Sequence, residues 1–228
     1  MKRLVKHYGD LYSKYGITEK SLGWTKNKQD IRFKQLLRFM DFSEKGKMLD
    51  IGCGFGDAYD YVCKNIKCNI EYSGIDIMPQ FIDYANSKYT NKGDADYPKF
   101  ILDDFMQFED KNKYDYIIAS GIFGHKLYYN DKDNYDYIDK AFEKCMTLCK
   151  KDGVVAVNFL SDKVDYHTSE EDFHAAPEKI LAIAYNHSRN IILDNSVMPF
   201  EYSITIFKND EFVKEKTIFS RYINKNQR

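Results

Sequence analysis

The sequence has no apolar run that approaches the length of a membrane-spanning helix. Residues 1–7 are basic, but the apolar core of a signal peptide does not follow them. Positive and negative side chains are almost balanced, since the formal net charge is −1. A bulk attraction to nucleic acid or to an anionic membrane is therefore not expected. These absences predict a cytoplasmic protein whose partners are small molecules.

Cysteine is scarce and its spacing is uninformative. The five cysteines form no CxxC pair and their number is odd, so a disulfide framework is not indicated; they are Cys53, Cys63, Cys68, Cys145 and Cys149. No spacing typical of zinc ligands is present. Asp194 and Asn195 are the one suggestive pair for another metal, and a turn is the better interpretation. The sequence therefore predicts no metal site.

Short apolar runs alternate with helical spacing along the chain. The runs rich in β-branched and aromatic residues lie near 48–51, 71–76, 99–102, 114–119 and 153–159. Helical spacing is found between them, at 57–67, 79–89 and 135–150. This alternation predicts an α/β fold, with a doubly wound, mostly parallel sheet and helices on both faces.

A glycine-rich turn follows the first of these strands. Gly52, Gly54 and Gly56 let the backbone turn sharply and approach a ligand, and the amides of the next helix would face that ligand. A dinucleotide fingerprint requires a third glycine where this chain has Asp57. A carboxylate there suits a ligand with positive groups better than a pyrophosphate. S-adenosylmethionine carries an ammonium and a sulfonium and has no phosphate.

The segment 49–57 resembles motif I of the class I S-adenosylmethionine-dependent methyltransferases. Three more segments are similar to that family's later motifs and come in its order: 72–77, 100–105 and 114–123. The resemblance covers about residues 24–207. It implies a Rossmann-like, seven-stranded sheet whose last strand is antiparallel, and S-adenosylhomocysteine as the product. The fourth motif reads Ala-Ser-Gly-Ile-Phe-Gly-His, unlike that of amino-methylating DNA enzymes, so base methylation is not expected.

The resemblance also implies one domain with three parts. Residues 1–42 are expected to form a helical cap, residues 43–208 the cofactor-binding core, and residues 209–228 a C-terminal extension. Strands at 191–193 and 202–207 would form an antiparallel hairpin that completes the sheet. The protein is expected to be a monomer or a homodimer.

The cofactor-binding residues follow from the motif positions. In the core they are Asp50, Gly52, Cys53, Gly54, Gly56, Asp76, Ile77, Asp104, Phe105, Ser120 and Gly121. Asp76 is expected to hold the ribose hydroxyls, and Asp104 with Phe105 to bracket the adenine. In the cap, Trp24 would contact the cofactor or anchor the cap. Arg32 would pair with the methionine carboxylate, or with a structural or solvated partner.

Two loops are expected to flank the methyl group. His125 lies just beyond the segment 114–123 and His167 follows the fifth strand, so either could act as a general base for a hydroxyl acceptor. Four further residues are expected to bind the acceptor: Tyr128, Asn158, Tyr166 and His174. The absence of clustered arginines argues against a large polyanion. The acceptor would be an N or O atom of a small polar metabolite, such as an amino alcohol, its phosphate or a sugar.

Two other functions share the predicted fold. An aminopropyltransferase would need an acidic base in the fourth motif, where this chain has residues 120–122, Ser-Gly-Ile. A non-catalytic protein that only binds S-adenosylmethionine would show tight binding without turnover. The sequence does not identify the acceptor, the general base or the role of the C-terminal extension.

Overall fold

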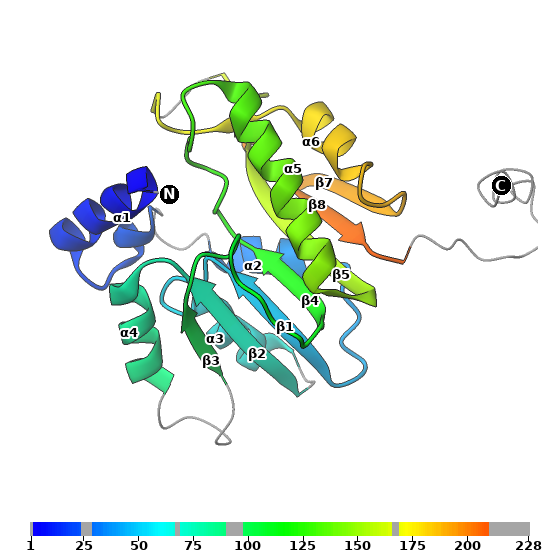
Figure 1. The fold of residues 1–228 in the computed structure, drawn as a ribbon, viewed down its shortest axis with the longest axis horizontal. Coiled ribbons are helices and arrows are strands. Elements are labelled where there is room, and N and C mark those ends of the chain that lie inside the picture. Colours follow the sequence, from blue (N-terminus) through cyan, green and yellow to red (C-terminus); the bar gives the residue numbers. More distant parts are fainter. Residues whose placement is uncertain (1, 24–28, 67–68, 90–97, 166–168, 210–228) are drawn as a thin grey trace, which may run out of the picture.

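The computed structural model describes residues 2–23, 29–66, 69–89, 98–165 and 169–209 (Figure 1). Seven strands form one sheet in the order β3-β2-β1-β4-β5-β8-β7. Their bounds are β1 Gly46–Ile51, β2 Ile70–Asp76, β3 Lys99–Leu102, β4 Tyr114–Ala119, β5 Cys149–Ser161, β7 Ile191–Met198 and β8 Glu201–Phe207. The two-residue strand β6, His174–Ala175, pairs with β5 off this path.

Strand β8 is the one strand of the described sheet that runs against its neighbours. It pairs antiparallel with β5 and with β7, whereas β1 to β5 pair in parallel. The predicted α/β class, the parallel core and the closing antiparallel hairpin are confirmed. Strand β6 was not expected, because a two-residue bridge leaves no apolar pattern in the sequence.

Helices cover both faces of the sheet, as predicted. Their bounds are α1 Lys2–Tyr15, η1 Glu19–Leu22 (a 3₁₀ turn), α2 Gln29–Leu37, α3 Asp57–Asn65, α4 Pro79–Tyr89, α5 Asp131–Leu148 and α6 Pro177–Ala184. The apolar sides of α5 and α6 pack on one face, and those of α2, α3 and α4 pack on the other. Along β1, for example, Leu49 belongs to the first core and Met48 to the second. Successive side chains of a strand point to opposite faces of the sheet, so each strand contributes to two separate hydrophobic cores.

Both ends of helix α5 differ from those expected, and α3 ends at Asn65 rather than at 67. Helix α5 begins at Asp131 rather than at 135, because the side chain of Asn130 accepts a hydrogen bond from the amide of Asp133 at 2.8 Å. It ends at Leu148, and β5 begins at once with Cys149, which pairs with Tyr114 across a register shift. The strand therefore begins four residues before the expected start at 153.

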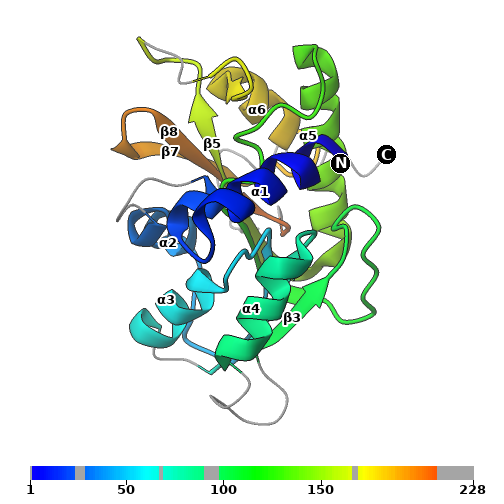
Figure 2. The same cartoon turned by 90° about the vertical axis from the view of Figure 1, so that its left-hand side faces the viewer.

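Helix α1 lies at the carboxyl end of the parallel strands. Figure 1 shows the arrowhead of β2 pointing toward it, and Figure 2 shows α1 crossing the front of the molecule above α4. Tyr8 and Tyr12 of α1 both make edge-on ring contacts with Phe81 of α4. Among the described residues, no helix has the length and apolarity to cross a bilayer.

Candidate active site

The glycine turn joins β1 to α3 and is held against the next strand. The amides of Gly52 and Cys53 both donate to the carbonyl of Ile75, at 2.8 and 3.0 Å. Gly52 has a φ of 73°, and a Cβ at this position would collide with the side chain of Ile122. Only glycine fits this conformation without strain. The turn therefore presents bare backbone toward the space above the sheet.

Cys53 fills the space that a glycine leaves on the neighbouring strand. A Cβ added at Gly74 of β2 would lie 2.7 Å from the sulfur of Cys53. The Cys53 thiol is buried, and burial raises its pKa well above the ordinary value, with Asp76 and Asp50 adding to the effect. Cys53 is therefore a neutral packing group beneath the turn, not a nucleophile.

Asp76 ends β2 and fixes the turn from the other side. Its two carboxylate oxygens accept hydrogen bonds from the amides of Gly54 at 3.0 Å and Met78 at 2.9 Å. Burial raises the pKa of Asp76 to about 6, and these amides act in the opposite direction. Each oxygen still has a lone pair for a ligand hydroxyl. This is the geometry that ribose recognition requires.

Asp50 is a second buried carboxyl at the base of the site. The Tyr72 hydroxyl donates to its Oδ2 at 2.5 Å. Burial raises the pKa of Asp50 to about 7 against the effect of Tyr72, and Asp76 and Asp57 raise it further. Near neutral pH this carboxyl is therefore poised between its two protonation states.

The turn, these carboxyls and the cap line a cavity that is partly open to solvent. Ten predicted cofactor residues line it together: Asp50, Gly52, Cys53, Gly54, Asp76, Ile77, Asp104, Phe105, Ser120 and Gly121. The eleventh core residue, Gly56, caps α3 and donates its amide to the Cys53 carbonyl at 2.9 Å. Gly56 shapes the turn and does not line the cavity.

The cap supplies one wall of the cavity through residues that were not among the predicted site residues. It contributes Leu4, Tyr8, Leu22, Gln29 and Phe33 to the cavity lining. Leu4 and Tyr8 are four residues apart on α1, a spacing that could have marked them as one helix face. Asp57, Asp103 and Tyr137 also line the cavity and were not among the predicted site residues.

Arg32 is placed differently from the expected contact with a cofactor carboxylate. Its guanidinium makes a buried two-point ion pair with Glu201 of β8, in which Nε donates to Oε2 at 2.7 Å. Arg32 does not line the cavity. Of the partners that the sequence left open for Arg32, the structure therefore shows the structural one, a buried carboxylate of the protein itself.

Asn158 links this ion pair to the loop after β4. Its Oδ1 accepts from the amide of Gly121 at 2.7 Å, and its Nδ2 donates to Glu201 Oε2 at 3.2 Å. Asn158 is buried and does not line the cavity, so it positions the wall instead of contacting an acceptor directly.

The remaining acceptor candidates are dispersed. His174 Nδ1 lies 2.8 Å from the Ser161 carbonyl, and neither His174 nor Tyr128 lines the cavity. His125 is buried beside His7 of α1 and Glu171, outside the cavity lining, although Ile122 and Leu127 on either side of it line the cavity. Three predicted residues lie outside the described residues: Trp24, Tyr166 and His167.

A glycine turn, a strand-end carboxylate and an apolar wall at the carboxyl ends of parallel strands define a protein that binds a nucleoside-containing cofactor. The family described as "Methyltransferase domain" matches residues 49–155, which run from β1 into β5. Rv1506c of Mycobacterium tuberculosis (strain ATCC 25618 / H37Rv), which carries a methyltransferase name, is 22% identical over 175 residues, or 75% of this chain and 99% of its own.

Two solved structures share the fold. The N-methyltransferase NodS of Bradyrhizobium japonicum WM9, in complex with S-adenosyl-L-homocysteine, has a TM-score of 0.63 at 16% identity, covering 90% of this chain and 99% of NodS. An S-adenosylmethionine-dependent methyltransferase of Clostridium acetobutylicum ATCC 824 has a TM-score of 0.57 at 12% identity, covering 89% and 98%. The family match over residues 49–155, the relative and these structures together support a class I S-adenosylmethionine-dependent methyltransferase.

The residues at the cavity fit this cofactor. The bare turn at Gly52 admits close approach, Asp76 retains acceptors for the ribose, and Asp104 with Phe105 lines the wall that follows β3.

Proposed function

We propose that this methyltransferase methylates an N or O atom of a small polar metabolite, and that this metabolite carries an amino group. The observation that carries the proposal is the charge of the cavity. Five aspartates line it: Asp50, Asp57, Asp76, Asp103 and Asp104. Among the described residues of the lining there is no lysine, arginine or histidine.

This charge pattern separates the acceptor classes that the sequence left open. An acidic cavity without a described cation attracts an ammonium group and repels a phosphate. An amino alcohol or an amino sugar therefore fits better than an amino-alcohol phosphate. The name of NodS, an N-methyltransferase, also supports an acceptor that carries an amino group.

Two tyrosines of the cavity lining, Tyr8 and Tyr137, carry hydroxyl groups. Burial raises the pKa of Tyr8 to about 12, with Asp76 and Asp172 adding to it, and burial also raises the pKa of Tyr137. Both hydroxyls therefore stay protonated at neutral pH and can donate hydrogen bonds to an acceptor. S-adenosylmethionine supplies an already activated methyl group. The protein then needs to align the acceptor and exclude water, and Leu4 and Phe33 provide apolar cover.

Binding and turnover test the proposal in two steps. Isothermal titration with S-adenosylmethionine, and in parallel with NAD and decarboxylated S-adenosylmethionine, should show micromolar binding of the first alone. Release of S-adenosylhomocysteine is then measured with amines, amino alcohols, their phosphates and neutral sugars. Turnover confined to the amines and amino alcohols supports the proposal. Preference for phosphates or sugars, or tight binding without turnover on any acceptor, contradicts it.

A further inference from the structure

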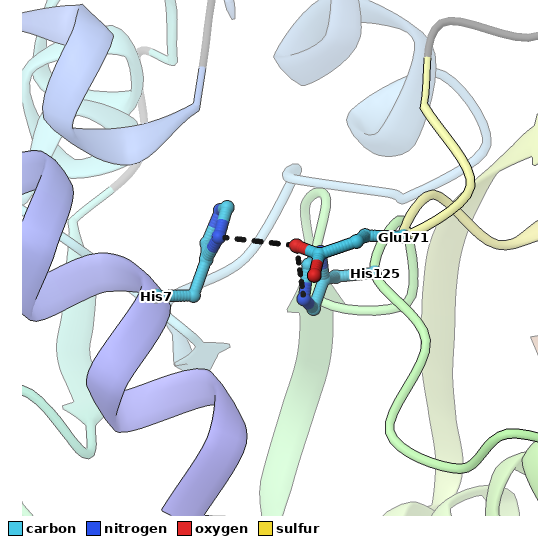
Figure 3. Close-up of side chains that lie close together, drawn as sticks. All are labelled: His7, His125 and Glu171. Carbon is cyan, nitrogen blue, oxygen red and sulfur yellow. Dashed lines mark ion pairs between the residues drawn. The ribbon is translucent and has the colours of Figure 1, made fainter.

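Three potential metal ligands from separate segments meet outside the cofactor cavity. They are His7 on α1, His125 in the loop after β4, and Glu171 in the loop after β5 (Figure 3). One ligand atom of each lies within 4.8 Å of the others. We propose that these three side chains bind a divalent transition-metal ion of the zinc type, which fastens α1 to the two loops. The sequence predicted no metal site, because no local spacing relates these residues.

The backbone fixes two of the three ligands relative to each other. His125 and Asp172 form an antiparallel bridge. The amide of Lys126 donates to the Glu171 carbonyl at 2.8 Å, and the amide of Phe173 donates to the Gly124 carbonyl at 3.0 Å. The loops that carry His125 and Glu171 are therefore joined before any ion binds, which lowers the entropy cost of binding.

Both histidines approach the same carboxylate oxygen. His7 Nδ1 and His125 Nε2 each lie 3.9 Å from Glu171 Oε2, and both dashed lines in Figure 3 end on this oxygen. Neighbouring ligand atoms of a tetrahedral zinc ion are about 3.3 Å apart, since Zn–N and Zn–O bonds are about 2.0–2.1 Å long. The Glu171 side chain is 53% exposed and can move by the difference.

A second, independent observation at His125 points to a bound ion. Its side chain is only 7% exposed, and its Nε2 has no hydrogen-bond partner among the described residues. A buried polar atom without a partner is costly in a folded protein.

The second oxygen of Glu171 is held by a different group. Arg3 Nη2 lies 3.3 Å from Oε1, which leaves Oε2 turned toward the two histidines. Two imidazoles and one carboxylate form a donor set that suits zinc and related ions, and not calcium or magnesium. The arginine would orient the carboxylate without touching the ion itself.

The ion would act on the cap. Leu4 and Tyr8, on either side of His7 in α1, line the cofactor cavity, whereas the three ligands do not. Binding would therefore hold α1 in the position that closes this cavity. This role is independent of the identity of the acceptor.

Untagged protein freed of metal by a chelator should bind Zn²⁺ with a stoichiometry of one in isothermal titration. Co²⁺ should give the visible absorption of a four- or five-coordinate site. Amide exchange in α1 should slow when Zn²⁺ is added. His7→Ala and Glu171→Gln, both at partly exposed positions, should each weaken Zn²⁺ binding at least tenfold.

His187→Ala is the matched control, because His187 also lies beside a carboxylate, with Nε2 2.7 Å from Asp139 Oδ1, but far from the proposed ligands in the sequence. Its Zn²⁺ affinity should equal that of the unmodified protein. A Cys63→Ser background excludes binding through the exposed thiol. Absence of stoichiometric binding, or equal affinity in the His7→Ala and Glu171→Gln variants, would overturn the proposal.

Discussion

The side chain of Asn158 accepts a hydrogen bond from the backbone amide of Gly121 at 2.7 Å and so ties the loop after β4 to the middle of β5. The same side chain donates to Glu201, which is paired with Arg32 of α2. A buried polar connection thus runs from the cap through two strands to the wall of the cofactor cavity.

Asn158→Ala should reduce the free energy of unfolding by about 1–3 kcal/mol, because it leaves buried polar groups unsatisfied. Turnover should fall as well, since Gly121 lines the cavity. Ser203→Ala is the control: Ser203 pairs with Asn158 in the sheet and is fully buried, and its hydroxyl has no hydrogen-bond partner among the described residues. Urea denaturation that shows equal losses for both variants would contradict this role.

Arg32→Met should destabilise the protein by about 3–5 kcal/mol, because it leaves the Glu201 carboxylate buried and uncompensated. The double variant Arg32→Met with Glu201→Met should recover part of this loss. Chemical denaturation measures both effects. If Arg32→Met instead kept full stability and lost only cofactor affinity, the result would favour the alternative that Arg32 pairs with the methionine carboxylate of the cofactor.

Asp76→Asn should weaken S-adenosylmethionine binding by about 1.5–3 kcal/mol for each charge-assisted hydrogen bond to the ribose that it removes, or roughly 10- to 100-fold. Asp83→Asn, on the exposed side of α4, is the control and should leave the affinity unchanged. Isothermal titration compares the two variants. Equal affinity of Asp76→Asn and the unmodified protein would show that the end of β2 does not hold the ribose.

Without cofactor, the protein should lose stability as the pH rises from 5 to 8. The folded-state pKa values of Asp76 and Asp50 are raised to about 6 and about 7, whereas an unfolded aspartate titrates near 4. The folded state therefore binds these protons more tightly, and the resulting stability is complete below pH 4 and is lost through pH 6 and 7. Urea midpoints should show this slope, and Asp50→Asn should flatten it. An unchanged slope in that variant would contradict the assignment.

His167→Ala tests the general-base candidate that lies outside the described residues. We expect unchanged cofactor affinity and a lower kcat, because His167 follows the fifth strand, whose loop is expected from the sequence to flank the reacting methyl group. Matched titration and turnover measurements separate these two effects. A variant that fails to fold, or that loses only cofactor affinity, would remove His167 from the acceptor site.

Local chemistry explains what the sequence could predict. The turn from Gly52 to Gly56 and the strand that ends at Asp76 are short segments in which spacing sets backbone geometry, and they fall where expected. Arg32 shows the limit of this reasoning. A charged residue on an apolar helix face requires a partner, but nothing local indicates Glu201, 169 residues away.

The same limit hid the cluster of His7, His125 and Glu171. Its members come together because α1 crosses the carboxyl ends of the strands and because two loops pair with each other. Each residue alone occupies an ordinary helix or loop position. Contacts between separate segments depend on the tertiary packing, which a single sequence does not reveal.

Cys53 and Gly74 share one volume between adjacent strands, and this constrains how the two positions can vary during evolution. A larger residue at position 74 would need a glycine at position 53, because a Cβ at position 74 would lie 2.8 Å from the Cβ of residue 53 as well as 2.7 Å from the Cys53 sulfur. Position 53 is variable in the motif itself, so its identity should track position 74 across related sequences. Covariation between these two positions, independent of any catalytic requirement, is the expected trace of this packing.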